Sequence, residues 1–285
     1  MSIQAAMLPD GKRLHLQHGP IDLIIEADGN PDQVSRAYAA AKTRFETVLG
    51  VLADELQTLR TLMPEAGLDV SGPIAQRMAA VVQPFWNSKV TPMAAVAGSV
   101  ADEMLCAMCA DAELSRAYVN NGGDIALHLA GGQTFSIASS NGPVAVRSTD
   151  PVRGIATSGW RGRSFSFGIA DSVTVLAATA AQADIAATLI ANEVNLPRSI
   201  KIRRAPAAAL YPDSDLGQRR VTVEVAELTG REVDTALTHG LEFAGQLQSH
   251  GLIVAATLGL NGDIRTLEAG SAEADSAMTG IRQHA

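Results

Sequence analysis

One carboxylate and one hydroxyl stand four residues apart in an alanine-rich part of the chain. Asp184 and Thr188 lie within residues 179–194, a run with the composition of a helix. Residues four apart share one face of a helix, so the two side chains would point the same way. Their oxygens could hold a hard cation such as Mg²⁺, or a metal bound to phosphate. The local alternative is that the helix dipole favours the aspartate and that the threonine bonds back to a carbonyl.

Two short glycine-containing motifs precede this pair. Gly122-Gly123-Asp124 follows the strand-like run 116–119, and Thr157-Ser158-Gly159 ends the strand-like run 155–159. Either motif alone is common in turns, because glycine adopts positive φ and small hydroxyls bond locally. The β-branched run 173–177 then leads into the alanine-rich segment. The sequence thus predicts three strands in order, the first two ending near these motifs and the third followed by a helix.

A third candidate binding segment is the start of the helix predicted at 93–110. Thr91 suits an N-cap and Pro92 the first helical position. Small residues such as Ala95 follow, and these allow a helix to approach a ligand closely. Free N–H groups at a helix start can bind an anion. Close packing of the small residues against a sheet is the other interpretation, and the segment alone is compatible with both.

Composition and charge exclude several classes of protein. The chain has 285 residues, of which 47% are hydrophobic but only 4% aromatic, so the core is expected to consist of Ala, Val, Leu and Ile. The net charge of −8 argues against binding to nucleic acid, and more weakly against anionic membranes. We see neither a secretory signal nor an apolar run of membrane-spanning length, and we expect a cytoplasmic protein without a membrane partner.

The cysteines and histidines form no recognisable site. Cys106 and Cys109 have C-x-x-C spacing, but they lie inside a helical pattern and no second pair completes a zinc site. We interpret them as two buried small apolar residues. The histidines are scattered singly, and His128 in a strand-like run is interpreted as a satisfied strand residue.

The order of helical and strand-like patterns predicts an α+β protein. We expect mixed or antiparallel sheets packed with long alanine-rich helices in one interlocked domain. Its expected parts are a hairpin at 12–27, a helical part at 31–110, a core sheet with the site helix at 116–194, a strand–helix–strand part at 200–268 and a frayed tail at 269–285.

The motifs in this order resemble the flavin transferase (ApbE) superfamily, whose members move FMN from FAD onto a protein threonine. In that family a Gly-Gly-Asp turn, a strand ending in Thr-Ser-Gly and an Ala-Asp-x-x-x-Thr helix follow one another. Here these are Gly122-Gly123-Asp124, Thr157-Ser158-Gly159, and Ala183-Asp184 with Thr188. The resemblance covers roughly residues 90–195 well, and the flanks by element order only.

The resemblance implies an ApbE-like fold with FAD as ligand or substrate. Asp184 and Thr188 would be the catalytic pair that binds Mg²⁺ at the pyrophosphate, where a cation neutralises developing charge. A protein would accept the transferred group. The nucleotide pocket would be shaped by the two turns and the helix start: Gly122, Gly123, Asp124, Thr157, Ser158, Gly159, Pro92 and Ala95.

One element departs from the family pattern. The flavin transferases carry a Ser-His-x-x-Asp-Pro element before the Val-rich strand, whereas this chain reads Ser166-Phe167-Gly168-Ile169-Ala170-Asp171-Ser172. Phe167 can stack on a ring in the flavin site, but it has no hydrogen-bonding group and carries no proton. The chain therefore resembles a divergent branch, that of the short bacterial and archaeal members.

Three hypotheses on function follow. The first is an Mg²⁺-dependent transferase or hydrolase acting on a flavin or another dinucleotide. The second is a non-catalytic flavin- or small-molecule-binding protein, which the phenylalanine at position 167 favours. The third is an oligomeric scaffold, since alanine-rich helices and exposed strand edges favour self-association into a homo-oligomer.

Overall fold

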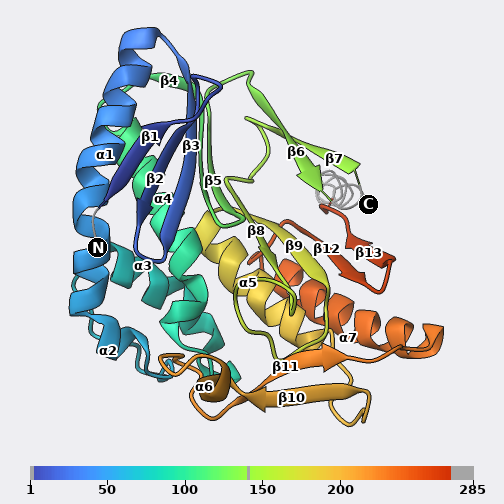
Figure 1. Cartoon of the computed structure of the whole chain (residues 1–285). Helices are drawn as coiled ribbons and strands as arrows, with labels where there is room; N and C mark the ends of the chain where they lie inside the picture. Colours follow the sequence, from blue (N-terminus) through green and yellow to red (C-terminus); the bar gives the residue numbers. More distant parts are fainter. Residues whose placement is uncertain (1–2, 140–141, 271–285) are drawn as a thin grey trace, which may run out of the picture.

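The computed structural model describes residues 3–139 and 142–270. Nine strands of the described chain form one antiparallel sheet in the order β1-β2-β3-β4-β5-β8-β9-β12-β13 (Figure 1). Their bounds are β1 Gln4–Met7, β2 Leu14–His18, β3 Ile21–Gly29, β4 Leu114–Asn121, β5 Asp124–Leu129, β8 Gly154–Ser158, β9 Ser172–Ala177, β12 Ala255–Leu260 and β13 Asp263–Leu267. The predicted α+β class with antiparallel strands is confirmed.

Two strand pairs stand apart from this sheet. They are β6 (Thr134–Ser139) with β7 (Gly142–Arg147), and β10 (Ile202–Pro206) with β11 (Arg220–Val225). The helices are α1 Pro31–Asp54, α2 Leu56–Leu59, α3 Pro73–Val82, α4 Val96–Cys109, α5 Ala180–Glu193, α6 Ala207–Leu210 and α7 Gly230–Ser249, with 3₁₀ turns η1 at Gln83–Ser88 and η2 at Pro92–Ala95. In Figure 1, α5 and α7 lie beside β8, β9 and β12, and the β10–β11 pair lies at the bottom.

The first long helix illustrates how sequence produces an element. The Asn30 side chain accepts the Asp32 N–H at 2.9 Å, and Pro31 occupies the first helical turn, as the sequence predicts. Ala37 and Phe45 belong to its buried stripe and face the sheet. Within the predicted helical part, this helix breaks at 55, between α1 and α2.

The interior consists of two main apolar clusters that meet between α4 and α5. The first joins β2–β4 to α1, α3 and α4, and the second joins β8, β9 and β12 to α5 and α7. Gly98 on α4 makes the junction possible, because a Cβ there would lie 2.3 Å from the Ala180 carbonyl oxygen. This backbone approach positions the start of α5, and with it the candidate site.

The pair β10–β11 and the loop between its strands form what we call the arm, residues 202–225. It reaches the rest of the protein through few backbone contacts, such as the Thr222 N–H donating to the Ser166 carbonyl at 2.9 Å. The first strand of the part predicted at 200–268 starts at Ile202, since the chain turns between Ser199 and Ile202.

Other boundaries also differ from the sequence predictions. The edge strand β1 precedes the predicted hairpin at 12–27 and was not predicted, and β12 starts at Ala255, three residues after the apolar run begins at Leu252. The delay arises because Gly251 adopts a φ of 70° and the Leu252 N–H still bonds to the carbonyl of Leu247, completing the end of α7. Residues 271–285 of the predicted frayed tail lie outside the described residues.

The interpretation of the cysteines was wrong. Cys106 on α4 is exposed and Cys109 is half-buried; both are free thiols. Burial raises the pKa of Cys109 to about 11, and the charge of Cys106 adds to this shift.

In the part of the chain that the structure describes, one helical segment, Pro92–Cys109, is long and apolar enough to cross a membrane by length and composition alone. Val100, Ala101 and Met104 of this segment are buried in the first apolar cluster. Its apolar character therefore has a role in the protein core.

Candidate functional site

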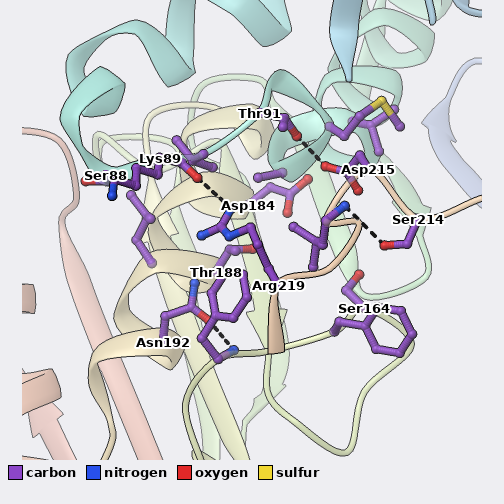
Figure 2. A pocket seen from close by; sticks show the side chains of 18 of the residues that line it. Ser88, Lys89, Thr91, Ser164, Asp184, Thr188, Asn192, Ser214, Asp215 and Arg219 are labelled. Carbon is purple, nitrogen blue, oxygen red and sulfur yellow. Dashed lines mark hydrogen bonds between the residues drawn. The ribbon is translucent and has the colours of Figure 1, made fainter. Parts of the chain in front are cut away.

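A cavity of about 1150 Å³ lies between α5, the segment that leads into α4, and the arm (Figure 2). Its volume is in the range of sites that hold sizeable small molecules. The residues that line the cavity include Ser88, Lys89, Thr91, Ala94 and Ala97 before and at α4; Asp124 on β5; Arg163, Phe167, Asp184, Thr188 and Asn192 around α5; Leu210, Tyr211, Asp215 and Arg219 on the arm; and His239 and Phe243 on α7.

Helix α5 presents a polar row to the cavity at four-residue steps: Asp184, Thr188 and Asn192. The helix begins at Thr179, whose hydroxyl accepts the Gln182 N–H at 3.2 Å. The Asp102 carboxylate accepts the N–H groups of Ala180 and Ala181, at 3.0 and 2.9 Å. These caps fix the position of the first helical turns, where the row begins.

Asp184 is tied to α4 and also open to the cavity. Its Oδ2 accepts the Gly98 N–H at 2.9 Å, and the side chain also lines the cavity. Burial raises the pKa of Asp184 well above its usual range, and the charge of Asp124 raises it further. The N–H groups of Gly98 and Ala97 act in the opposite direction without cancelling the shift.

Asp124 supplies the second carboxyl group on this wall. It follows the turn of Gly122 and Gly123, whose φ angles are 67° and 114°, and the Gly123 N–H donates to Asn120 Oδ1 at 2.8 Å. Burial raises the pKa of Asp124 to about 7, although the Thr157 N–H and the charge of Arg163 lower it. Two carboxyl groups with raised pKa values form a site where a divalent cation would stabilise both ionised forms.

The donor set suits a metal that shares its coordination with a ligand. Within residues 3–139 and 142–270, no group of three or more His, Cys, Asp and Glu side chains is arranged to hold an ion. Asp184, Thr188 and Asp124 would supply part of a coordination sphere. Mg²⁺ usually keeps several waters and binds through one or two carboxylates plus substrate phosphates, so the set fits Mg²⁺ brought together with a phosphorylated ligand.

The arm side of the cavity carries a stacked cation. The Arg219 guanidinium carbon lies 4.2 Å from the centroid of the Phe167 ring, and its NH1 donates to the Lys89 carbonyl at 2.6 Å. Beside it, the Thr91 hydroxyl donates to Asp215 Oδ2 at 2.5 Å. These contacts join the arm to the segment before α4 (Figure 2).

The chain is similar to a known protein family over most of its length. A family model described as "AbpE bacteria" matches residues 5–266. The chain belongs to this ApbE-like family. It is also 32% identical over 176 residues to a UPF0280 protein of Methanopyrus kandleri, covering 60% of this chain and 69% of the relative.

Further similarities are more partial or more distant. A UPF0280 protein of Methanothrix thermoacetophila is 37% identical over 148 residues, which span 50% of this chain and 61% of the relative. The flavinyl transferase ApbE of Pseudomonas stutzeri, solved in its apo form, aligns over 94% of this chain and 95% of its own, with 12% identity and a TM-score of 0.47.

The ApbE-like motifs bring together some of the predicted site residues and not others. Asp184, Thr188, Asp124 and Phe167 line the cavity. Gly122 and Gly123 shape the turn before Asp124 without lining the cavity themselves, and a Cβ on Gly122 would lie 2.8 Å from Arg163 NH1.

The Thr-Ser-Gly motif of this ApbE-like chain contributes backbone rather than side chains. The Thr157 hydroxyl pairs with that of Thr174 at 3.0 Å on an exposed strand face, and only its N–H acts on Asp124. Ser158 is half-buried and does not line the cavity. A Cβ on Gly159 would lie 2.4 Å from the Asp171 carbonyl oxygen, so this glycine allows close packing. None of the three residues lines the cavity, and their predicted part in shaping a nucleotide pocket stays a prediction.

The helix start also differs in detail. Pro92 and Ala95 are buried and do not line the cavity, whereas Met93, Ala94, Val96 and Ala97 do. The 3₁₀ turn over residues 92–95 rotates the small residues relative to a regular helix. Thr91 occupies the predicted N-cap position with Pro92 at the first helical residue, but its hydroxyl bonds to Asp215 instead of capping the helix.

Sequence reasoning missed Arg163, Asp215 and Arg219. The two on the arm lie C-terminal to the three motifs, within the part predicted as strand–helix–strand at 200–268. The only sequence signal there is the basic pair Arg219-Arg220 before an alternating strand. Such a pair is ordinarily solvated, so it gave no reason to place one of its members in a site.

Proposed function

We propose that this chain binds a flavin or another dinucleotide in the cavity, with Mg²⁺ at Asp184 and Thr188, and acts as a transferase or hydrolase on its pyrophosphate. The observation that carries the proposal is the placement of Asp184, Thr188 and Asp124 on one cavity wall. The raised pKa values of both carboxyl groups support it, because each group gains from a neighbouring cation. Membership of the ApbE-like family supports the same assignment.

The bound ion would neutralise charge that develops on the pyrophosphate and fix the geometry for in-line attack. The residues of the chain supply orientation. The Gly98 N–H bonds to Oδ2 of Asp184 and holds the carboxylate in position. Asp102 and Thr179 fix the helix that carries the pair. The accepting group in a transferase reaction would be the hydroxyl of a cytoplasmic protein, and water would replace it in a hydrolase.

A second candidate is a flavin-binding protein without catalysis. Phe167 favours it, because a phenyl ring lies where the flavin transferases have a histidine, and this ring is covered by Arg219. Phenylalanine moves no proton, so a reaction that depends on that step would be lost while binding persists.

The test is a thermal-shift titration with FAD, FMN, ADP and ATP, each in Mg²⁺ and in EDTA. Ligands that bind the native state raise the melting temperature with the logarithm of their excess. We expect FAD to raise it in Mg²⁺ and much less in EDTA. Asp184→Asn keeps an oxygen for the Gly98 N–H, and we expect this variant to fold and to lose the Mg²⁺-dependent part of the shift.

Asp54→Asn is the matched control, since Asp54 is an exposed carboxylate on α1 outside the cavity. A Mg²⁺-dependent shift that persists in Asp184→Asn, or an absence of any shift in the wild type, contradicts the proposed site. Chromatographic detection of FMN and AMP released from FAD then separates the enzyme from the non-catalytic binding protein.

A further inference from the structure

The guanidinium of Arg219 is held by two contacts and also faces the cavity. Its face rests on the Phe167 ring at 4.2 Å, and NH1 donates to the Lys89 carbonyl at 2.6 Å. Nε and NH2 make no hydrogen bond to any residue among 3–139 and 142–270, and the side chain lines the cavity. An arginine has five N–H donors in a planar fork, so several remain available to a ligand.

Phe167, on whose ring Arg219 stacks, is hydrogen-bonded to α5, the helix that carries the proposed metal site. The Phe167 N–H donates to Asn192 Oδ1 at 2.8 Å, and the Phe167 carbonyl accepts from Asn195 Nδ2 at 2.9 Å. Asn192 lies eight residues after Asp184 on the same face of α5, about 12 Å further along the helix axis. The Phe167 ring on which Arg219 stacks is therefore held at a fixed position relative to Asp184 by α5.

The cavity lining carries cations without salt-bridge partners, together with the acidic side chains of Glu193, Asp213 and Asp215. Arg60, Lys89 and Arg219 all line the cavity, and none of them forms a salt bridge within the described residues. Burial lowers the pKa of Arg219, and the nearby charge of Asp215 only partly offsets this shift. The Oδ2 of Asp215 is already engaged with the Thr91 hydroxyl.

A half-buried guanidinium with unused donors is costly unless an acceptor pairs with it. The planar fork matches the oxygens of a carboxylate or a phosphate, to which it binds through two parallel hydrogen bonds. The stacked Phe167 ring holds the fork in one orientation before a ligand arrives, which reduces the entropic cost of binding.

We propose that Arg219 binds an oxyanion, phosphate or carboxylate, on the part of the ligand remote from the group held at Asp184 and Thr188. Phe167 and Asn192 are positioning residues that orient the guanidinium. The ligand would thus carry two negatively charged groups. One would be bound through the metal at Asp184 and Thr188, and the other would be bound directly by Arg219. This inference rests on the proposed function only for the identity of the metal-bound end.

The first experiment isolates the arginine end by working in EDTA. Melting temperature is followed against inorganic phosphate and, separately, succinate, with sodium chloride at matched ionic strength as reference. We expect both or one of these oxyanions to stabilise the wild type, and the stronger of the two identifies the preferred group. Arg219→Gln should lower the apparent affinity about tenfold or more, as expected when a charged donor is lost.

The control variants separate recognition from folding. Arg220→Gln changes the neighbouring exposed arginine, whose NH2 donates to the Arg204 carbonyl, and it should bind the oxyanion like the wild type. Arg219→Lys keeps the charge without the planar fork and should retain part of the affinity. Phe167→Leu leaves Arg219 in place but removes the stacking, so a smaller loss is expected even if Arg219→Gln folds poorly.

Equal oxyanion affinity in the wild type, Arg219→Gln and Phe167→Leu overturns the inference, as does the absence of stabilisation by either oxyanion beyond that of chloride. Asp184→Asn should bind the oxyanion in EDTA like the wild type. A variant that loses the Mg²⁺-dependent FAD shift but still binds the oxyanion in EDTA has a defect at the metal site. A variant that keeps the Mg²⁺-dependent FAD shift but loses oxyanion binding has a defect at Arg219.

Discussion

The two walls of the cavity are built in different ways. The α5 wall, with Asp184 and Thr188, is held by backbone approaches and helix caps deep in the protein. The arm wall, with Asp215 and Arg219, is held by a few side-chain contacts between segments more than a hundred residues apart. The first wall is expected to be preorganised, and the second is expected to open at lower free energy.

The difference has a consequence for ligand binding. A preorganised wall suits a metal, because ligand geometry around Mg²⁺ tolerates little distortion. A wall joined by side chains can part to admit a large ligand and then close over it. Each of the following predictions tests whether the two walls differ in this way.

The largest effect is expected at the junction beneath the α5 wall. Gly98→Ala places a Cβ 2.3 Å from the Ala180 carbonyl oxygen, so the backbone of α4 or α5 must shift. We expect a loss of about 3 kcal/mol in the free energy of unfolding, measured in urea. Gly50→Ala, in an exposed part of α1 with open space around it, should instead stabilise by about 0.5–1 kcal/mol. Similar results for both variants would show that the junction is not rigid.

The next effect concerns the two carboxyl groups on the α5 wall. Asp124 and Asp184 have pKa values raised by folding, that of Asp124 to about 7. A raised pKa means that the unfolded chain releases the proton more readily, so stability is retained below about pH 4 and lost as the pH rises through 7. The loss is roughly 1.4 kcal/mol for each unit by which the folded and unfolded pKa values differ.

We therefore expect the metal-free protein to be less stable at pH 8 than at pH 5. Asp124→Asn should reduce this difference, and Mg²⁺ should restore stability at pH 8 in the wild type only. Denaturant unfolding at both pH values, in EDTA and in Mg²⁺, provides the measurement. A wild-type stability in EDTA that is equal at pH 5 and pH 8 would mean that these carboxyl groups titrate normally.

A smaller global effect is expected at the contact that holds the arm. Thr91 is only 2% exposed, and Thr91→Val removes the donor to the Asp215 carboxylate. We expect a cost of about 1–2 kcal/mol, with faster amide exchange in the arm than in α5. Thr235→Val is the control, since that hydroxyl bonds only to a carbonyl in its own helix. Equal protection of the arm and of α5 from amide exchange in Thr91→Val would show that the two walls do not differ in local stability.

The smallest effect lies outside both walls. Cys109 has a pKa of about 11, whereas Cys106 is exposed on the same helix. At pH 8 about one thiol in a thousand would be ionised at Cys109. A thiol-reactive disulfide should therefore modify Cys106 quickly and Cys109 far more slowly, as mass spectrometry of Cys106→Ser and Cys109→Ser variants would show. Equal rates would mean that α4 opens readily next to the α5 wall.

The sequence predicted those parts of the site that depend on local periodicity. The shared helix face of Asp184 and Thr188, and the start of α1 at Asn30 and Pro31, follow from spacing and capping preferences within a few residues. The family resemblance placed Asp124 near the same site, and the structure puts all three residues on one cavity wall.

The parts that were missed depend on contacts between distant segments. Arg219 reaches Phe167 only because the arm folds across the cavity, and Thr157 turns its hydroxyl outward because of the register with Thr174. Strand register and the docking of a loop are set by the whole fold, and alternation within a five-residue strand does not reveal which face meets a cavity. Likewise, the rotation that removes Ala95 from the lining comes from a 3₁₀ turn without a distinct sequence signal.

The most direct test of the metal site is a crystal of the protein soaked with Mn²⁺ and FAD. Mn²⁺ replaces Mg²⁺ at oxygen sites and is located by its anomalous scattering. We predict one peak at coordination distance from the Asp184 carboxylate and the Thr188 hydroxyl, bridged to a phosphate oxygen of the ligand. A peak elsewhere, or FAD bound in the cavity with no metal at these two side chains, would contradict the assignment.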